Sequence, residues 1–134
     1  MAAVFLLVVV AAFVAYAVRQ ASVQQQTTIA DVQSARAYQA AKAGLEWAAY
    51  QVLRTSLNPA CPAGTIGFAG TTLADFAATV TCTRTDATEG AFTVTTYSIT
   101  STACNAGTCP SGSPTSVYAE RQVGLTLTKC TANC

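Results

Sequence analysis

The first eighteen residues of the chain, MAAVFLLVVVAAFVAYAV, contain no charged side chain. In helical form such a run spans about 27 Å, close to the roughly 30 Å hydrocarbon thickness of a bilayer. No proline occurs before Pro59, so no residue of that kind breaks a helix that continues beyond the apolar run. Residues 1–18 therefore predict a helix that spans a membrane or packs in an equally apolar environment.

Residues 19–54 predict the continuation of this helix, because they are rich in Ala, Gln, Arg and Leu. The Gln-rich stretch 20–28 is its weakest part and is a candidate joint between membrane and head. Gly44 costs about 1 kcal/mol inside a helix, which indicates close packing there. Apolar side chains spaced by three and four predict a buried stripe formed by Val32, Ala35, Tyr38, Ala41, Leu45, Ala48 and Val52.

The segment 55–134 predicts a small head with three β-strands. A first strand alternates apolar residues with threonines from Phe76 to Thr83, after a Gly-containing loop at 63–70 and before a hairpin connection at 85–90. In the second strand, Phe92 and Val94 face away from Tyr97 and Ile99, which predicts a bulge or a strong twist near Thr95 and Thr96. The third strand places on one face Val117, Ala119, Val123, Leu125 and Leu127.

The sheet has one apolar face that needs a cover, and the helical stripe supplies it. The predicted fold class is therefore α+β, with a long N-terminal helix at 1–54 packed on a small antiparallel sheet in the head at 55–134. Within the helix, 1–18 is the predicted membrane-spanning part.

All six cysteines fall in the head, at Cys61, Cys82, Cys104, Cys109, Cys130 and Cys134. Their even number in an exported head predicts disulfides and an oxidising compartment. A structural zinc site would favour two-residue spacings between paired cysteines, which these lack.

Six cysteines allow fifteen pairings, so the sequence does not choose among them. The set that we favour joins sequence neighbours. Cys61 follows the helix and Cys82 ends the apolar face of the first strand, while each remaining pair encloses a short turn. The expected bridges are Cys61–Cys82, Cys104–Cys109 and Cys130–Cys134.

The composition argues against an enzyme. The chain has no histidine, its acids show no pairing pattern, and it has no Gly-rich phosphate loop. We expect no cofactor and no bound metal. A net charge of +1 with 10% charged residues also argues against nucleic acid as a partner.

Three features remain as candidates for contacts. The loop 104–116 (CNAGTCPSGSPTS) is a candidate contact surface, although a plain structural loop is the simpler interpretation. Trp47 and Tyr50 are expected in the core rather than in an exposed aromatic patch. Tyr16 is expected at the interfacial end of the membrane span.

The apolar run also has a small-residue site, Ala15–Tyr16–Ala17, of the kind found in cleaved signals. No basic residues precede the run, however, which favours a retained helix. We expect that a basic leader has been removed from it or lies upstream of Met1.

The chain resembles type IV pilin-like proteins, and in particular the MshP family of mannose-sensitive haemagglutinin (MSHA) pilus biogenesis. The resemblance rests on MAAVFLLVVV, on QSARAYQAAKAGLEWAAYQVL with its segment AGLEW, and on CTRT and YAERQV in the head. Two positions depart from the class. Phe5 stands where major pilins carry a glutamate, which MshP-like and some other minor pilins also lack. Ser22 stands where many major pilins carry a proline.

The resemblance implies leader cleavage, N-terminal methylation and helices packed in the core of an extracellular filament. Its partners are then other copies or other pilins, the inner membrane before assembly and the pilus assembly machinery. The residues expected in the filament core are Met1, Ala2, Ala3, Val4, Phe5, Leu6, Leu7, Val8, Val9, Val10, Ala11, Ala12, Phe13 and Val14.

Two other functions stay open. The chain is alternatively an adhesin or binding module, located at a filament tip or anchored in the membrane, whose disulfide-held loops contact a surface. A pseudopilin of type II secretion is a related third possibility.

Overall fold

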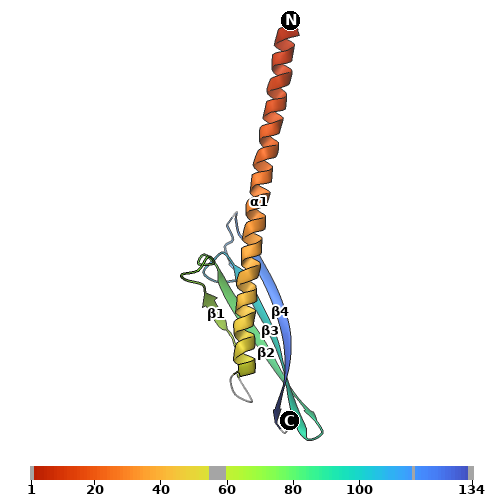
Figure 1. The fold of residues 1–134 in the computed structure, drawn as a ribbon, viewed down its shortest axis with the longest axis vertical. Helices are drawn as coiled ribbons and strands as arrows, with labels where there is room; N and C mark the ends of the chain where they lie inside the picture. The colour runs from red at the N-terminus through yellow and green to blue at the C-terminus, as the bar shows by residue number, and fades with distance from the viewer. Residues whose placement is uncertain (1, 55–59, 116, 133–134) are drawn as a thin grey trace. The chain divides into compact units, whose positions relative to one another are not determined.

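The computed structural model describes residues 2–54, 60–115 and 117–132. It has one helix and four strands, an α+β fold in which the helix packs on an antiparallel sheet, as predicted (Figure 1). The elements in chain order are α1 (Ala2–Arg54), β1 (Gly64–Gly67), β2 (Ala77–Glu89), β3 (Phe92–Cys104) and β4 (Glu120–Ala132).

The chain divides into two compact units, Met1–Val32 and Gln33–Cys134. The first unit consists of the N-terminal part of α1. The second combines the rest of α1 with the sheet, and its core joins Ala48 and Val52 of the helix to Val80, Tyr97 and Ile99 of β2 and β3. The unit that carries the sheet therefore begins within the helix and not at residue 55, because residues 33–54 share its core.

The sheet is an antiparallel meander in the order β1-β2-β3-β4. The prediction of a plain loop at 63–70 was wrong, because residues 64–67 form β1 and pair with β2 from Gly64↔Val80 to Gly67↔Ala77. Two glycines in four residues hide this strand from propensity arguments. Its pairing with the edge of β2 supplies the backbone hydrogen bonds that make it a strand.

The hairpin connection predicted at 85–90 is also wrong. Residues 85–89 belong to β2, and the hairpin closes at Glu89↔Phe92 around Gly90 and Ala91. Gly90 has φ +62, a left-handed conformation that a residue with a Cβ rarely adopts. The apolar alternation stops at Cys82, but threonines favour extended backbone as strongly as apolar residues do and carry the strand further.

The bulge predicted near Thr95 and Thr96 does not occur there. The pairing of β2 with β3 is regular over its whole length, and the register shift lies at Thr93/Val94 in the pairing with β4. Thr95 shares the buried face with Tyr97 and Ile99. A threonine can be buried on this face because the Thr95 hydroxyl donates a hydrogen bond to Asp86.

In the third predicted strand, Val123, Leu125 and Leu127 are half-buried on one face, as expected. The strand itself begins at Glu120, so Val117 and Ala119 precede it, and Val117 is exposed. The side chain of Asn105 explains this late start, since it hydrogen-bonds the carbonyl of Val117 and the amide of Ala119 and holds them in a loop.

The buried stripe of the helix differs from the predicted one. Ala41, Ala48 and Val52 are buried as expected, whereas Val32, Ala35 and Tyr38 are exposed. Small side chains allow the helix to lie close to the sheet, so residue size selects the buried face more than hydrophobicity does. Among the helical residues whose burial is described, the buried ones are Ala37, Ala40, Ala41, Gly44, Ala48 and Val52.

Gly44 marks the close approach that the sequence predicted. A Cβ at this position would lie 2.5 Å from Oγ of Ser101, 3.1 Å from Cβ of Ala78 and 3.4 Å from Cγ2 of Val80. The Ser101 hydroxyl is buried and has no hydrogen-bond partner among the described residues. The glycine therefore sets the distance between α1 and the sheet.

We expect Gly44→Ala to destabilise the head by about 1 kcal/mol, because overpacking costs about 1–3 kcal/mol and the gain in helix propensity returns about 1 kcal/mol. Ser101→Ala in the same chain should recover part of the loss, since it removes the nearest clashing atom. Urea unfolding of the full chain in detergent measures both. Gly107→Ala is the control, expected within about 0.5 kcal/mol because nothing lies within 4 Å of a Cβ there. A Gly44→Ala variant more stable than the wild type would contradict this account.

Candidate functional site

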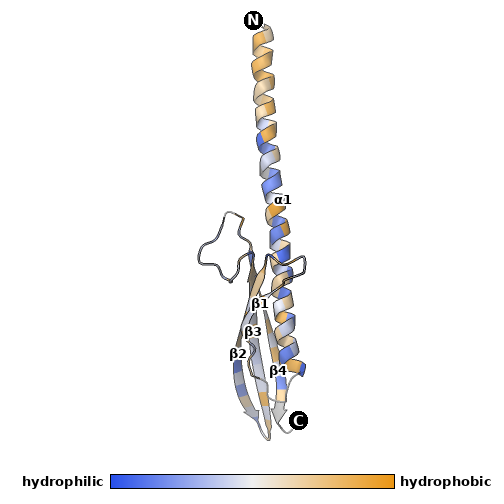
Figure 2. Cartoon of the chain, turned by 90° about the vertical axis from the view of Figure 1, so that its left-hand side faces the viewer, coloured by the Kyte–Doolittle hydropathy of each residue, from blue (hydrophilic) through white to orange (hydrophobic). Residues whose placement is uncertain are grey.

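The apolar run forms the N-terminal part of α1, and hydrophobic residues dominate this part of the helix (Figure 2). By length and composition it can cross a membrane, and none of it is buried within its own unit. Phe5 is 69% exposed and Leu7 is 70% exposed. Of the residues predicted for a filament core, 2–14 lie on this helical surface, and Met1 lies outside the described residues.

The Gln-rich stretch that follows is helical in the structure rather than melted. Its hydroxyl groups donate hydrogen bonds to carbonyls one turn earlier in the helix, with Thr27 and Thr28 both reaching the carbonyl of Gln24 at 2.9 Å. At the end of the apolar run, Nε2 of Gln20 donates to the Tyr16 hydroxyl at 2.7 Å. Polar side chains are thus bonded within the helix itself at the position where the apolar surface ends.

Two of the three expected disulfides are present as predicted. Cys61 is bonded to Cys82 and Cys104 to Cys109. Cys130 is also disulfide-bonded, but its expected partner, Cys134, lies outside the described residues. Cys61 and Cys82 pack at the margin of the cluster around Val80, so this bridge fastens the segment before β1 to the helix-facing side of β2.

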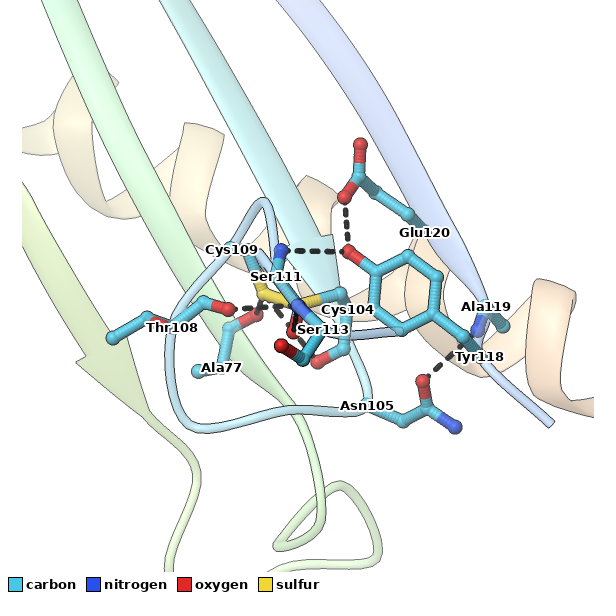
Figure 3. The surroundings of a disulfide bond; sticks show 10 residues. All are labelled: Ala77, Cys104, Asn105, Thr108, Cys109, Ser111, Ser113, Tyr118, Ala119 and Glu120. Carbon is cyan, nitrogen blue, oxygen red and sulfur yellow. Dashed lines mark hydrogen bonds between the residues drawn. A yellow bond between two sulfur atoms is a disulfide. The ribbon is translucent and has the colours of Figure 1, made fainter. Parts of the chain in front are cut away.

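The second disulfide anchors the loop predicted as a contact surface (Figure 3). Cys104 and Cys109 are buried together with Ala77 of β2. The Cys109 sulfur lies 3.2 Å from the carbonyl oxygen of Ala77. The first turn of the loop is therefore fixed against the edge of the core, and Gly107 and Thr108 are exposed above it.

Tyr118 holds the far end of the same loop. Its hydroxyl donates a hydrogen bond to the carboxylate of Glu120 and accepts one from the backbone amide of Ser111 at 3.0 Å (Figure 3). Burial, followed by the hydrogen bond to Glu120, raises the pKa of Tyr118. Asn105 adds hydrogen bonds of 2.8 Å to the Val117 carbonyl and 2.9 Å from the Ala119 amide.

The loop is thus held at several points, yet its exposed surface is chemically plain. Its exposed side chains over residues 107–115 are small and uncharged, and its predicted last residue, Ser116, is not described. Among the described residues no cluster of three or more cysteines and acids is arranged to hold a metal. The loop therefore exposes an uncharged surface whose two ends are bonded to the head.

Trp47 and Tyr50 were expected in the core, and this expectation was wrong. Both are exposed, because they lie on the side of α1 opposite Ala48 and Val52, which face the sheet. The small buried stripe leaves the large aromatic side chains on the outer face of the helix.

The structure contains a polar cluster that the sequence did not reveal. It lies on the helix-facing side of the sheet, beyond the apolar core, and consists of Arg84, Asp86 and Thr95. Asp86 was expected in a turn but lies on β2. It receives hydrogen bonds from Thr95 Oγ1 at 2.6 Å and from Arg84 at 2.9–3.0 Å. These bonds, with that from Thr95 contributing most, hold the pKa of Asp86 below its ordinary value of 3.8. The alternation of Arg84 and Asp86 in one strand was the available signal.

We expect this carboxylate to make stability fall in acid. The folded pKa lies below 3.8, so its contribution is complete above the unfolded pKa and is lost as pH falls through the folded pKa. Urea unfolding of the full chain from about pH 6 to about pH 2 should show wild type and Asp86→Asn converging at the acid end. A constant difference over this range would contradict the assignment. Asp75→Asn, in an exposed turn, is the control.

Comparison with protein-family models, with curated proteins and with solved structures finds no match to this chain. The class of this protein is therefore defined by the features of its own sequence and structure. The described residues contain one apolar helical segment long enough to cross a membrane, and a disulfide-bonded α+β head.

Proposed function

We propose that this protein is a structural subunit, a pilin or minor pilin, of a type IV pilus-like extracellular filament. The observation that carries the proposal is the long apolar surface of residues 2–18, with side chains such as Phe5, Leu7 and Phe13 exposed on a helix that continues to Arg54. Apolar surface of this extent requires a lipid or protein environment, because exposing it to water is costly.

The mechanism is an exchange of environments. Before assembly the segment lies in the inner membrane as a single-pass helix. In the filament the helices of neighbouring copies replace the lipid, so the transfer keeps apolar contacts on every side. Without a hydrophobic driving force between helices in lipid, association depends on close contacts, for which the small side chains of Ala2, Ala3, Ala11 and Ala12 are suited.

The head fits the same function. A subunit outside the cell needs a domain that stays folded in an oxidising compartment, and the two described bridges fasten both the segment before β1 and the loop after β3. The second candidate function is a binding module at a filament tip, which the exposed, disulfide-held loop after β3 favours. A subunit repeated along the fibre supports the structural role, whereas a subunit confined to the tip supports the binding role.

Deletion of residues 1–18 tests the proposal. We expect the truncated chain to be found outside the membrane fraction, with its disulfides formed, and to be missing from fibres sheared from the cells. The full chain in the same cells is the control. Fibres that contain the truncated chain at the normal level would overturn the proposal, as would a full chain that loses residues 1–18 on export and functions as a free head.

A further inference from the structure

Besides Tyr38 and Val117, the large apolar side chains exposed on the described part of the second unit lie at two places. Trp47, Tyr50 and Leu53 recur every third residue on the outer face of α1, at 38%, 59% and 55% exposure. Phe92, 49% exposed, lies at the tip of the β2–β3 hairpin. Exposed aromatic and large aliphatic side chains grouped in this way are typical of protein interfaces.

The hairpin tip is open to a partner. The hairpin extends beyond the C-terminal end of α1 (Figure 1). Phe92 lies directly opposite Glu89 in the register, so both side chains share one face. Because strand faces alternate and Tyr97 and Ile99 face the helix, this shared face is the one turned away from α1.

The two places carry opposite charges. Arg54 follows Leu53 at the end of the helical patch, and Glu89 neighbours Phe92 at the tip. The ion pairs among the described residues are Lys42–Glu46 and Arg84–Asp86, so neither Arg54 nor Glu89 is used in one. Each surface has an apolar centre; the helical surface adds the base Arg54, and the hairpin tip adds the acid Glu89. The two surfaces are therefore complementary in both hydrophobicity and charge.

We propose that the hairpin tip of one copy, through Phe92 and Glu89, docks on Trp47, Tyr50, Leu53 and Arg54 of a neighbouring copy. The inference rests on the proposed function, which brings many copies together. The contact joins two different surfaces and is therefore heterologous. Repeated contacts of this kind produce a closed ring when the rotation between copies closes and an open helical array when it does not. The open array is the form that a filament requires.

A photo-reactive benzophenone amino acid in place of Phe92, in the full chain, tests the contact. Two co-expressed forms with different affinity tags identify adducts between copies, and peptide mapping locates them. We expect adducts within residues 47–54 of the other copy. Adducts only at other positions, or no adducts while the chain is in fibres, would overturn the proposal. The same group at Thr126, exposed on β4, is the matched control and should give none at residues 47–54.

Charge exchange provides a second readout. Arg54→Glu and Glu89→Arg should each lower the adduct yield about three- to tenfold, the range for loss of a modest ion pair plus a repulsion. The double variant should return the yield to near the starting level, whereas Arg36→Glu, an exposed charge elsewhere on the helix, should not change it. If the two single variants each lower the adduct yield and the double variant lowers it by both effects combined, the pairing of Arg54 with Glu89 is overturned.

Membranes and sheared fibres are assayed separately, so this inference and the proposed function fail in different ways. Fibres that contain the chain without these adducts overturn the docking alone. If the chain is found only in the membrane and still gives these adducts, the filament proposal is overturned and the docking proposal is supported. A chain confined to the membrane that gives none overturns both.

Discussion

Val9→Asp should abolish entry of the chain into fibres while leaving the head folded. An ionised side chain at the centre of a membrane helix costs about 2.5–3.5 kcal/mol on insertion scales, and no basic residue precedes Arg19 in the sequence to pair with it. A free energy of this size lowers the inserted population roughly one hundredfold. Measurement of fibre content and of the Cys61–Cys82 bridge in the same cells separates assembly from folding.

Ser22→Asp is the matched control for this experiment. It adds the same charge to the same helix, but at an exposed position in the polar stretch after the apolar run. We expect near-normal fibre content for this variant. Normal content for Val9→Asp as well would show that residues 2–18 do not pack in an apolar environment, and the account of assembly would then be wrong.

Replacement of Cys61 and Cys82 by serine should destabilise the head by about 3 kcal/mol. The two residues are separated by 21 positions, and the chain-entropy model gives a loss of this size when such a loop is opened in the unfolded state. Urea unfolding of the full chain in detergent measures the difference. An effect of this size is a large part of the stability of a small domain.

The Cys104–Cys109 bridge provides the internal comparison. It spans 5 positions, for which the same model gives about 2 kcal/mol. Serine at these two positions should therefore cost less than serine at 61 and 82. The reverse order, or no loss on removal of the Cys61–Cys82 bridge, would contradict the assigned role of that bridge.

The sequence predicted those features that depend on strong local patterns. The apolar run, the α+β class and the two sequence-neighbour disulfides are found as expected. The close packing at Gly44 was predictable because a glycine inside a helix carries a cost that something must offset.

The predictions that were wrong concern segments whose conformation or buried face is decided by tertiary contacts and not by the local sequence. The sheet accepts the alanine face of α1, so a stripe chosen by hydrophobicity placed Val32 and Tyr38 on the wrong side. β1 is a strand because β2 offers it an edge, although its glycines disfavour strands. The exposure of Trp47 and Tyr50 follows from the same choice of helix face, and no local pattern around these residues indicates it.

The most direct test of the filament assignment is the location of the chain in fibres sheared from cells that produce it. Mass spectrometry of the purified fibres and immunogold labelling with an antibody against the head measure this together. The account predicts peptides from the intact apolar helix in the fibre fraction, with label along the fibre. A chain recovered only from membranes, or only as a soluble head without residues 1–18, would contradict it.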